Sequence, residues 1–139
     1  MELRFFEIYR SSEYLLLLAE GILTSAALTV SAGIMGFVLA ILLASARHHR
    51  WPVLGQLSAT FIEFVRNTPL IVQLFFVAFG LPLLLGYQWA FWAHALLALI
   101  INFSAYFAEI LRSGFLSVPV GQLEAAKTLG IPRFTAFWK

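Results

Sequence analysis

Two long stretches without a charged side chain constrain what this chain can fold into. No Asp, Glu, Lys or Arg occurs in residues 21–46, and none occurs in residues 67–108. A helix rises 1.5 Å per residue, so about 20 apolar residues cross the roughly 30 Å hydrocarbon core of a bilayer. The first stretch predicts one membrane span with length to spare. The second is too long for one span and predicts two spans joined by a tight turn.

The composition agrees with a membrane protein. The 139 residues are 61% hydrophobic and 12% charged, whereas soluble domains average about 45–50% apolar and about 25% charged residues. Cysteine is absent, which excludes a disulfide framework and thiolate chemistry. We therefore expect an all-α, polytopic helical membrane protein with three transmembrane helices in this chain.

Basic residues, tryptophans and turn residues set the expected boundaries. The first span is Gly21–Ala46, and it is followed by the basic cluster Arg47–Arg50 and by Trp51, an interfacial anchor. Apolar residues then recur at helical spacing through residues 53–66, and this helix leads into a second span at about 69–85. A turn at residues 81–88 separates it from a third span at about 88–111.

The segment before the first span has a different character. Residues 1–20 interleave acidic residues with aromatic and apolar ones, and we expect an interfacial amphipathic segment outside the cytoplasm, with residues 21–139 forming the membrane domain. A cleaved secretory signal would need a basic start and an apolar run of only about 7–15 residues. The basic residues predict the orientation. Two, Arg4 and Arg10, fall on the amino-terminal side, and the positive-inside rule places the other seven in the cytoplasm. Those seven are Arg47, Arg50, Arg66, Arg112, Lys127, Arg133 and Lys139.

Small residues in the first span indicate a surface where another helix can approach closely. They include Gly33 and Gly36. The others in this stripe are Ser25, Thr29, Ala32 and Ala40. Such stripes permit close packing in lipid, although small residues are also common in membrane helices for no specific reason.

Polar residues inside the spans are the candidates for a function. Gln73 lies in the second span, and Asn102 and Tyr106 lie one turn apart on the third. Polar groups in hydrocarbon face the interior of a bundle or a wet cavity. These three residues are therefore candidates for lining a translocation path, with hydrogen bonding between helices as the other interpretation.

Two titratable residues of the third span have structural interpretations. Glu109 should lie near the cytoplasmic surface and pair with Arg112 three residues on, rather than relay protons. His94 lies about 9 Å from the outer interface, at 1.5 Å per residue, and we expect a hydrogen-bonded interface residue. The adjacent His48 and His49 do not converge on one ion, so no metal site is expected.

Catalytic and nucleotide-binding motifs do not stand out. A serine, histidine and acid set could be assembled only from opposite ends of the bilayer. Residues 33–36 contain two glycines but lack the Lys-Ser or Lys-Thr of a phosphate-binding loop. We expect a protein that is not an enzyme and holds no cofactor, and any ATP would be bound by another chain.

A short polar segment after the third span predicts a helix-turn-helix elbow. Pro119 suits the first turn of a helix, and Gly130 suits the left-handed position that ends one. These signals predict a helix of about three turns from Pro119 to Leu129. Ile131-Pro132 then begins a second helix, because proline suits a first turn and not a helix interior.

This elbow and the segment before the second span carry a family resemblance. Glu124-Ala125-Ala126, with Gly130 six residues after Glu124, resembles the cytoplasmic EAA signature of the membrane subunits of ABC importers. Residues 61–76 and 80–82, reading FIEFVRNTPLIVQLFF and GLP, resemble the polar amino acid permeases of that class, and 105–109, 112–114 and 121–122 continue the pattern. One departure is Asn67, where relatives usually have Gly.

The resemblance implies a permease subunit that forms the path for polar amino acids by alternating access in a bacterial inner membrane. Its implied partners are a second permease subunit, an ABC ATPase and an extracytoplasmic solute-binding protein. The elbow would be the helix that couples to the ATPase, with Glu124, Ala125, Ala126 and Gly130 making or shaping that contact. Members have about five transmembrane helices, so a partial chain is implied. A membrane scaffold or small channel that recruits a cytoplasmic protein through the elbow is the alternative.

Overall fold

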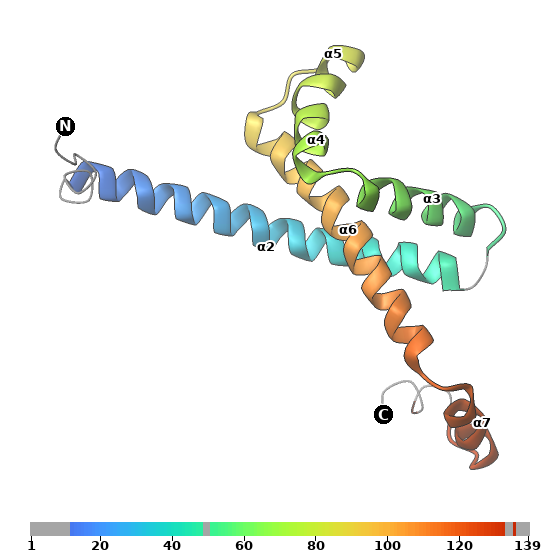
Figure 1. The fold of residues 1–139 in the computed structure, drawn as a ribbon. Coiled ribbons are helices and arrows are strands. Elements are labelled where there is room, and N and C mark those ends of the chain that lie inside the picture. The colour runs from blue at the N-terminus through green and yellow to red at the C-terminus, as the bar shows by residue number, and fades with distance from the viewer. Residues whose placement is uncertain (1–11, 49–50, 133–134, 136–139) are drawn as a thin grey trace, which may run out of the picture.

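The structure is a computed structural model that describes residues 12–48, 51–132 and 135. Every regular element in these ranges is helical, which confirms the all-α prediction (Figure 1). In chain order the elements are α2 (Ser12–His48), α3 (Leu54–Asn67), α4 (Leu70–Phe75), the π-helix η1 (Phe76–Gly80), α5 (Leu81–Leu85), α6 (Phe91–Ser117) and α7 (Val120–Thr128).

Two of these helices, α2 and α6, are long and apolar enough to cross a membrane. A third span exists only as a bent pair, in which α3 and the segment Leu70–Leu85 meet at 106°. The bend falls at Thr68-Pro69, where Thr68 adopts an extended conformation with φ −103° and ψ 126°. Proline has no N–H and disfavours a helical conformation in the residue before it, so the helix breaks there.

Several predicted boundaries were wrong. α2 runs without a break from Ser12 to His48, so residues 12–20 belong to the same helix as residues 21–46, while residues 1–11 lie outside the described part. Residues 81–85, predicted as turn, form α5, because Pro82 occupies its first turn, where proline is tolerated. The chain turns instead at Gly86, with φ +70°. α6 runs to Ser117, beyond the predicted end at 111.

The core lies where α6 crosses α2 and α3 packs beside them (Figure 1). Its buried residues are Ala40 and Ala44 from α2, Ile62 from α3 and Ala108 from α6. Three of these four are alanines, which let the helix backbones approach closely. This core fixes α2, α3 and α6 relative to one another where they cross.

The predicted stripe of small residues is partly confirmed. Ala32, Gly36, Ala40 and Ala44 recur every fourth residue of α2 and are buried. At Gly36 an added Cβ would lie 3.0 Å from Cβ of Phe103 on α6, so only glycine fits without displacement. At Gly33, which is half-buried, nothing lies within 4 Å of such a Cβ. Ser25 and Thr29 are exposed.

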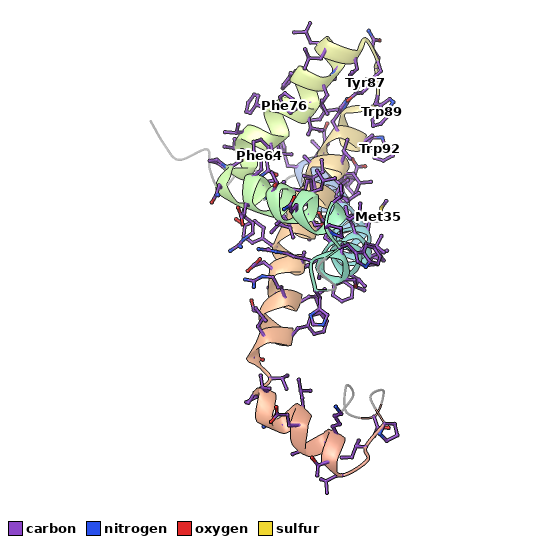
Figure 2. The ribbon with its side chains drawn as sticks, turned by 90° about the vertical axis from the view of Figure 1, so that its right-hand side faces the viewer. Met35, Phe64, Phe76, Tyr87, Trp89 and Trp92 are labelled. Carbon is purple, nitrogen blue, oxygen red and sulfur yellow. The ribbon has the colours of Figure 1, made fainter. Side chains whose placement is uncertain are left out.

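Much of the outer surface consists of large apolar side chains, as in a protein that faces lipid or other membrane helices. Met35, Phe64 and Phe76 are each more than half exposed and project from the ribbon (Figure 2). Trp89 and Trp92 gather with Tyr87 near the start of α6 (Figure 2). Tryptophan and tyrosine favour the membrane interface, which marks this end of α6 as one boundary of the spans.

Candidate functional site

The first helix and the turn of the elbow predicted from Pro119 and Gly130 are present, with one correction. Pro119 has an extended conformation, φ −61° and ψ 137°, and precedes α7 as its N-cap instead of occupying its first turn. The other end matches the prediction. Gly130 has φ +68°, its N–H donates to the carbonyl of Lys127 at 3.1 Å, and the N–H of Ile131 donates to Ala126 at 3.0 Å. This is a Schellman C-cap, and glycine adopts its left-handed position without strain.

The surface of α7 is open. Glu124 and Ala125 are exposed, and Ala126 is half-buried. The helix lies beyond the end of α6, away from the crossing of α2, α3 and α6 (Figure 1). The two alanines give it a flat face that another backbone can approach. The second helix was predicted to begin at Ile131-Pro132, but these two residues are not helical, and residues 133–134 and 136–139 lie outside the described part.

A charged cluster joins α2, α3 and α6. The Glu109 carboxylate on α6 lies 3.1 Å from Nη1 of Arg47 on α2 and 3.6 Å from Nη1 of Arg66 on α3. It also accepts hydrogen bonds from Arg112, including one from Nε at 3.0 Å. The predicted Glu109–Arg112 pair is confirmed. Arg47 and Arg66 were not anticipated as partners, although the positive-inside count had placed them at the same surface.

The predicted path residues Gln73 and Asn102 come together. Both are buried, and Nδ2 of Asn102 donates to Oε1 of Gln73 at 3.4 Å. Nε2 of Gln73 donates to the carbonyl oxygens of Val65 and Thr68, at 2.8 Å each. The two side-chain amides therefore bond to backbone carbonyls and to each other. This agrees with the alternative interpretation, hydrogen bonding between helices.

Tyr106 is arranged differently from the two amides. Its side chain is 45% exposed, and the Arg66 guanidinium carbon lies 5.8 Å from the centre of its ring. This is within the distance of a cation–π contact. Tyr106 therefore presents a hydroxyl and a ring at the surface, one turn of α6 closer to the charged cluster than Asn102.

His94 departs from its prediction. It is buried at 5% exposure, and within the described residues neither ring nitrogen has a hydrogen-bond partner. The expected hydrogen bond was wrong because the neighbouring loop offers aromatic rings. Tyr87 stacks on the imidazole with ring centres 5.7 Å apart, and the Trp89 ring centre lies at 6.0 Å.

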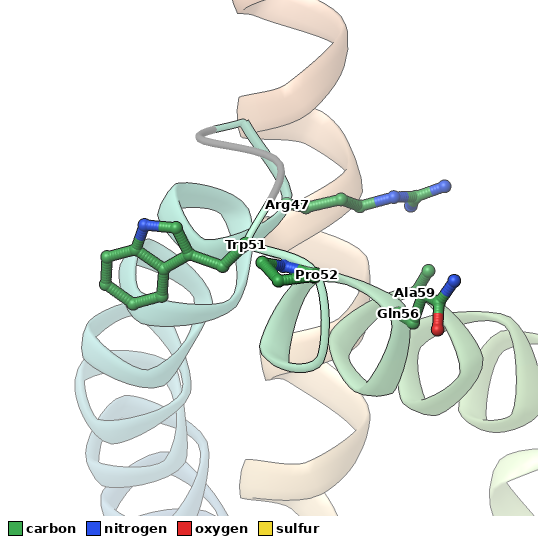
Figure 3. Close-up of a pocket in the computed structure, with 6 residues that line it drawn as sticks. Arg47, Trp51, Pro52, Gln56 and Ala59 are labelled. Carbon is green, nitrogen blue, oxygen red and sulfur yellow. The ribbon is translucent and has the colours of Figure 1, made fainter.

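A cavity of about 290 Å³ opens where α2 gives way to α3 (Figure 3). Its lining includes Arg47 and Trp51 together with Gln56 and Ala59. None of the predicted path residues lines it. A second cavity, of about 320 Å³, is lined by apolar side chains of α4, η1 and α6, among them Phe75 and Phe79.

Comparison with known proteins relates this arrangement to membrane transport. Residues 36–139 match the profile of a family described as the binding-protein-dependent transport system inner membrane component. The probable glutamine ABC transporter permease GlnP of Bacillus subtilis is 37% identical over 121 residues, covering 87% of this chain and 55% of the relative. The arginine transport system permease ArtQ of Bacillus subtilis is 39% identical over 114 residues, covering 81% of this chain and 52% of the relative.

Solved structures give the same relationship at the level of fold. A crystal structure of an amino acid ABC transporter with histidines aligns with 98% of this chain and 62% of that chain, with a TM-score of 0.84 and 33% identity. The inward-facing MetNI methionine ABC transporter aligns with 93% of this chain and 62% of that chain, with a TM-score of 0.69 and 20% identity. The chain spans about half the length of the curated relatives that it matches.

Proposed function

Because the chain belongs to the family of binding-protein-dependent transport system inner membrane components, we propose that it is a permease subunit of an ABC importer. It forms part of the path by which polar amino acids cross the membrane, and ATP hydrolysis in a separate subunit drives the movement. The observation that carries this proposal is α7, an exposed helix with a Schellman cap that is joined directly to a membrane-spanning helix.

The proposed partners are those that membership of the family suggests. An ATPase subunit docks on α7, where Glu124, Ala125 and Ala126 provide the contact and Gly130 sets the turn. A second permease subunit, identical or related, completes the path within the bilayer. A solute-binding protein delivers cargo at the opposite face. The amino acid specificity is supported by the glutamine and arginine permeases among the relatives.

The orientation has α7 in the cytoplasm and the amino terminus outside. The support is electrostatic, since Arg47, Arg66 and Arg112 gather around Glu109 at the α7 end of the bundle. Lys127 on α7 itself adds to this positive end. Basic residues beside membrane spans are retained on the cytoplasmic side.

The path runs along the surfaces of α4 and α6 that carry Gln73, Asn102 and Tyr106. Tyr106 is the residue among these that is available to touch cargo, because its side chain is exposed. The buried pair Gln73 and Asn102 shapes the wall behind it.

Affinity purification from gentle detergent tests the proposal. The tagged protein, expressed from its own locus, should co-purify with an ATPase subunit, identified by mass. Glu124→Lys and Gly130→Asp should each lower that recovery, while the matched charge reversal Glu63→Lys on α3, also an exposed carboxylate, should not. Recovery of the tagged protein by itself, or with partners that bind no nucleotide, would favour the membrane scaffold or small channel instead.

A further inference from the structure

The break between α3 and α4 deprives several carbonyl groups of their usual partners, those of Val65 and Thr68 among them. In a continuous helix each carbonyl accepts from the N–H four residues on. For Val65 that residue is Pro69, which has no N–H. For Thr68 it is Val72, whose N–H donates to the carbonyl of Pro69 instead, at 3.0 Å. A buried carbonyl without a donor is costly, so such a break is stabilised by side-chain donors.

Gln73 supplies these donors from the first turns of α4. Its Nε2 donates to the carbonyls of Val65 and Thr68, which are two of the groups freed by the break. The carbonyl of Val65 also accepts a long hydrogen bond from the N–H of Thr68, at 3.3 Å. Because carbonyl oxygens only accept, the amide orientation is fixed, and Oε1 is left as the acceptor. It faces Nδ2 of Asn102 on α6.

Thr68 offers a contrast at the same break. Its Oγ1 donates to the carbonyl of Phe64 at 2.8 Å, one turn back on α3. That bond starts and ends on the α3 side and does not reach α4. Removing it should therefore leave the angle between the two helices unchanged, which makes Thr68 a matched control.

We propose that Gln73 is a positioning residue that holds the break at a fixed angle and, through Asn102, fastens it to α6. The break is then a rigid corner and not a hinge. A movement that enters α6 reaches α4 through the two amides in addition to apolar contacts such as that of Phe79 with Phe91. The Glu109 cluster ties α6 to α2 and α3.

The role in transport follows from chain connectivity, and this step rests on the proposed function. Only Val118 and Pro119 separate α6 from α7, so a displacement of α7 passes directly into α6. With the amide pair intact, α4 follows. Without the amide pair, α6 moves and α4 does not move with it, so ATP hydrolysis continues with less transport.

Distance measurements between spin labels test the corner in the chain itself. The protein has no cysteine, so labels can be placed without removing any. One pair, at the exposed residues Leu57 on α3 and Leu83 on α5, reports the angle of the break. A second pair, at Leu83 and the exposed Ile110, reports the position of this segment relative to α6.

Each substitution has a distinct expected pattern in lipid nanodiscs. Gln73→Leu should broaden the distance distributions of both pairs, and Gln73→Met, with a side chain of similar length, should do the same. Asn102→Leu should broaden only the second pair, because Gln73 still bonds the two carbonyls. Thr68→Val should change neither. Unchanged distributions in the Gln73 variants would overturn the proposal, and so would loss of the helical spans in both of them.

A transport assay then separates this role from a merely structural one. In the assembled transporter, Gln73→Leu should lower transported molecules per ATP hydrolysed by roughly fivefold or more, the scale of typical coupling between sites. ATP hydrolysis itself should persist. If the unsubstituted complex transports nothing, the proposed function fails, but the label distances still decide whether Gln73 holds the corner. If the Gln73→Leu complex and the unsubstituted complex transport equally many molecules per ATP hydrolysed, the positioning role is contradicted.

Discussion

Gly36 and Gly33 offer a test of whether α2 and α6 cross as the structure has them. Both glycines lie in the same uncharged stretch of α2, three residues apart, and both have ordinary helical backbone conformations. Replacing either by alanine gains the same helix propensity, about 1 kcal/mol. Any difference between the two variants therefore reports the environment of the new methyl group.

The structure sets the size of that difference. At Gly36 the added Cβ would lie 3.0 Å from Cβ of Phe103, 3.2 Å from the backbone nitrogen of Ser104 and 3.4 Å from the carbonyl oxygen of Ile100. Carbon atoms pack at about 3.5–4.0 Å, so α6 must move away by roughly half an ångström and lose part of its contact with α2. Overpacking of this kind costs about 1–3 kcal/mol. At Gly33 nothing lies within 4 Å.

We expect Gly36→Ala to be less stable than Gly33→Ala by about 1–3 kcal/mol. Reversible unfolding in mixed detergent micelles with increasing dodecyl sulfate measures this difference, with helix content and an α2–α6 label distance as the two signals. A Gly36→Ala protein as stable as Gly33→Ala, or more stable, would refute the crossing described for these helices.

Two further substitutions test the polar groups of α6. Glu109→Gln removes the carboxylate shared by three guanidinium groups, and since these groups are 24–39% exposed, stability should fall by about 1–3 kcal/mol. The exposed Glu63, 3.8 Å from Arg47, is the control, and Glu63→Gln should cost less than about 0.5 kcal/mol. Equal losses of stability in Glu109→Gln and Glu63→Gln would contradict the role of Glu109 as the shared partner of the three guanidinium groups. His94→Phe keeps a ring against Tyr87 and removes two unpartnered nitrogens, so stability should be unchanged or rise by about 1–3 kcal/mol. Thermal unfolding in detergent measures it, and a clear loss would mean that the imidazole has a polar partner.

The sequence predicted features whose signals are local. Proline and glycine mark helix ends through their own backbone chemistry, so Pro119 and Gly130 located α7 to within a residue or two. The Glu109–Arg112 pair is three residues apart on one helix and follows from helix geometry alone. Two of the three predicted spans, α2 and α6, followed from apolar length apart from their ends, whereas the second corresponds to a bent helix pair.

Features that depend on how helices meet could not be predicted. Arg47 reaches Glu109 across 62 residues of chain, and no single-sequence pattern gives the register of that approach. Gly33 and Gly36 are alike in sequence, yet only one faces α6. The polarity of Gln73 did not reveal its partners. The carbonyls of Val65 and Thr68 need a side-chain donor only because the helix breaks at Thr68-Pro69.

The central claim, that α7 couples this chain to an ATPase, is tested most directly by crosslinking in native membranes. A cysteine placed at Ala125 on α7, treated with a short crosslinker, should join the chain to a nucleotide-hydrolysing subunit, and Gly130→Asp should lower that yield. A cysteine at Leu83, 86% exposed on α5, should give no such product. Crosslinks from position 125 only to lipid, to another copy of this chain or to a protein without nucleotide-hydrolysing activity would contradict the account.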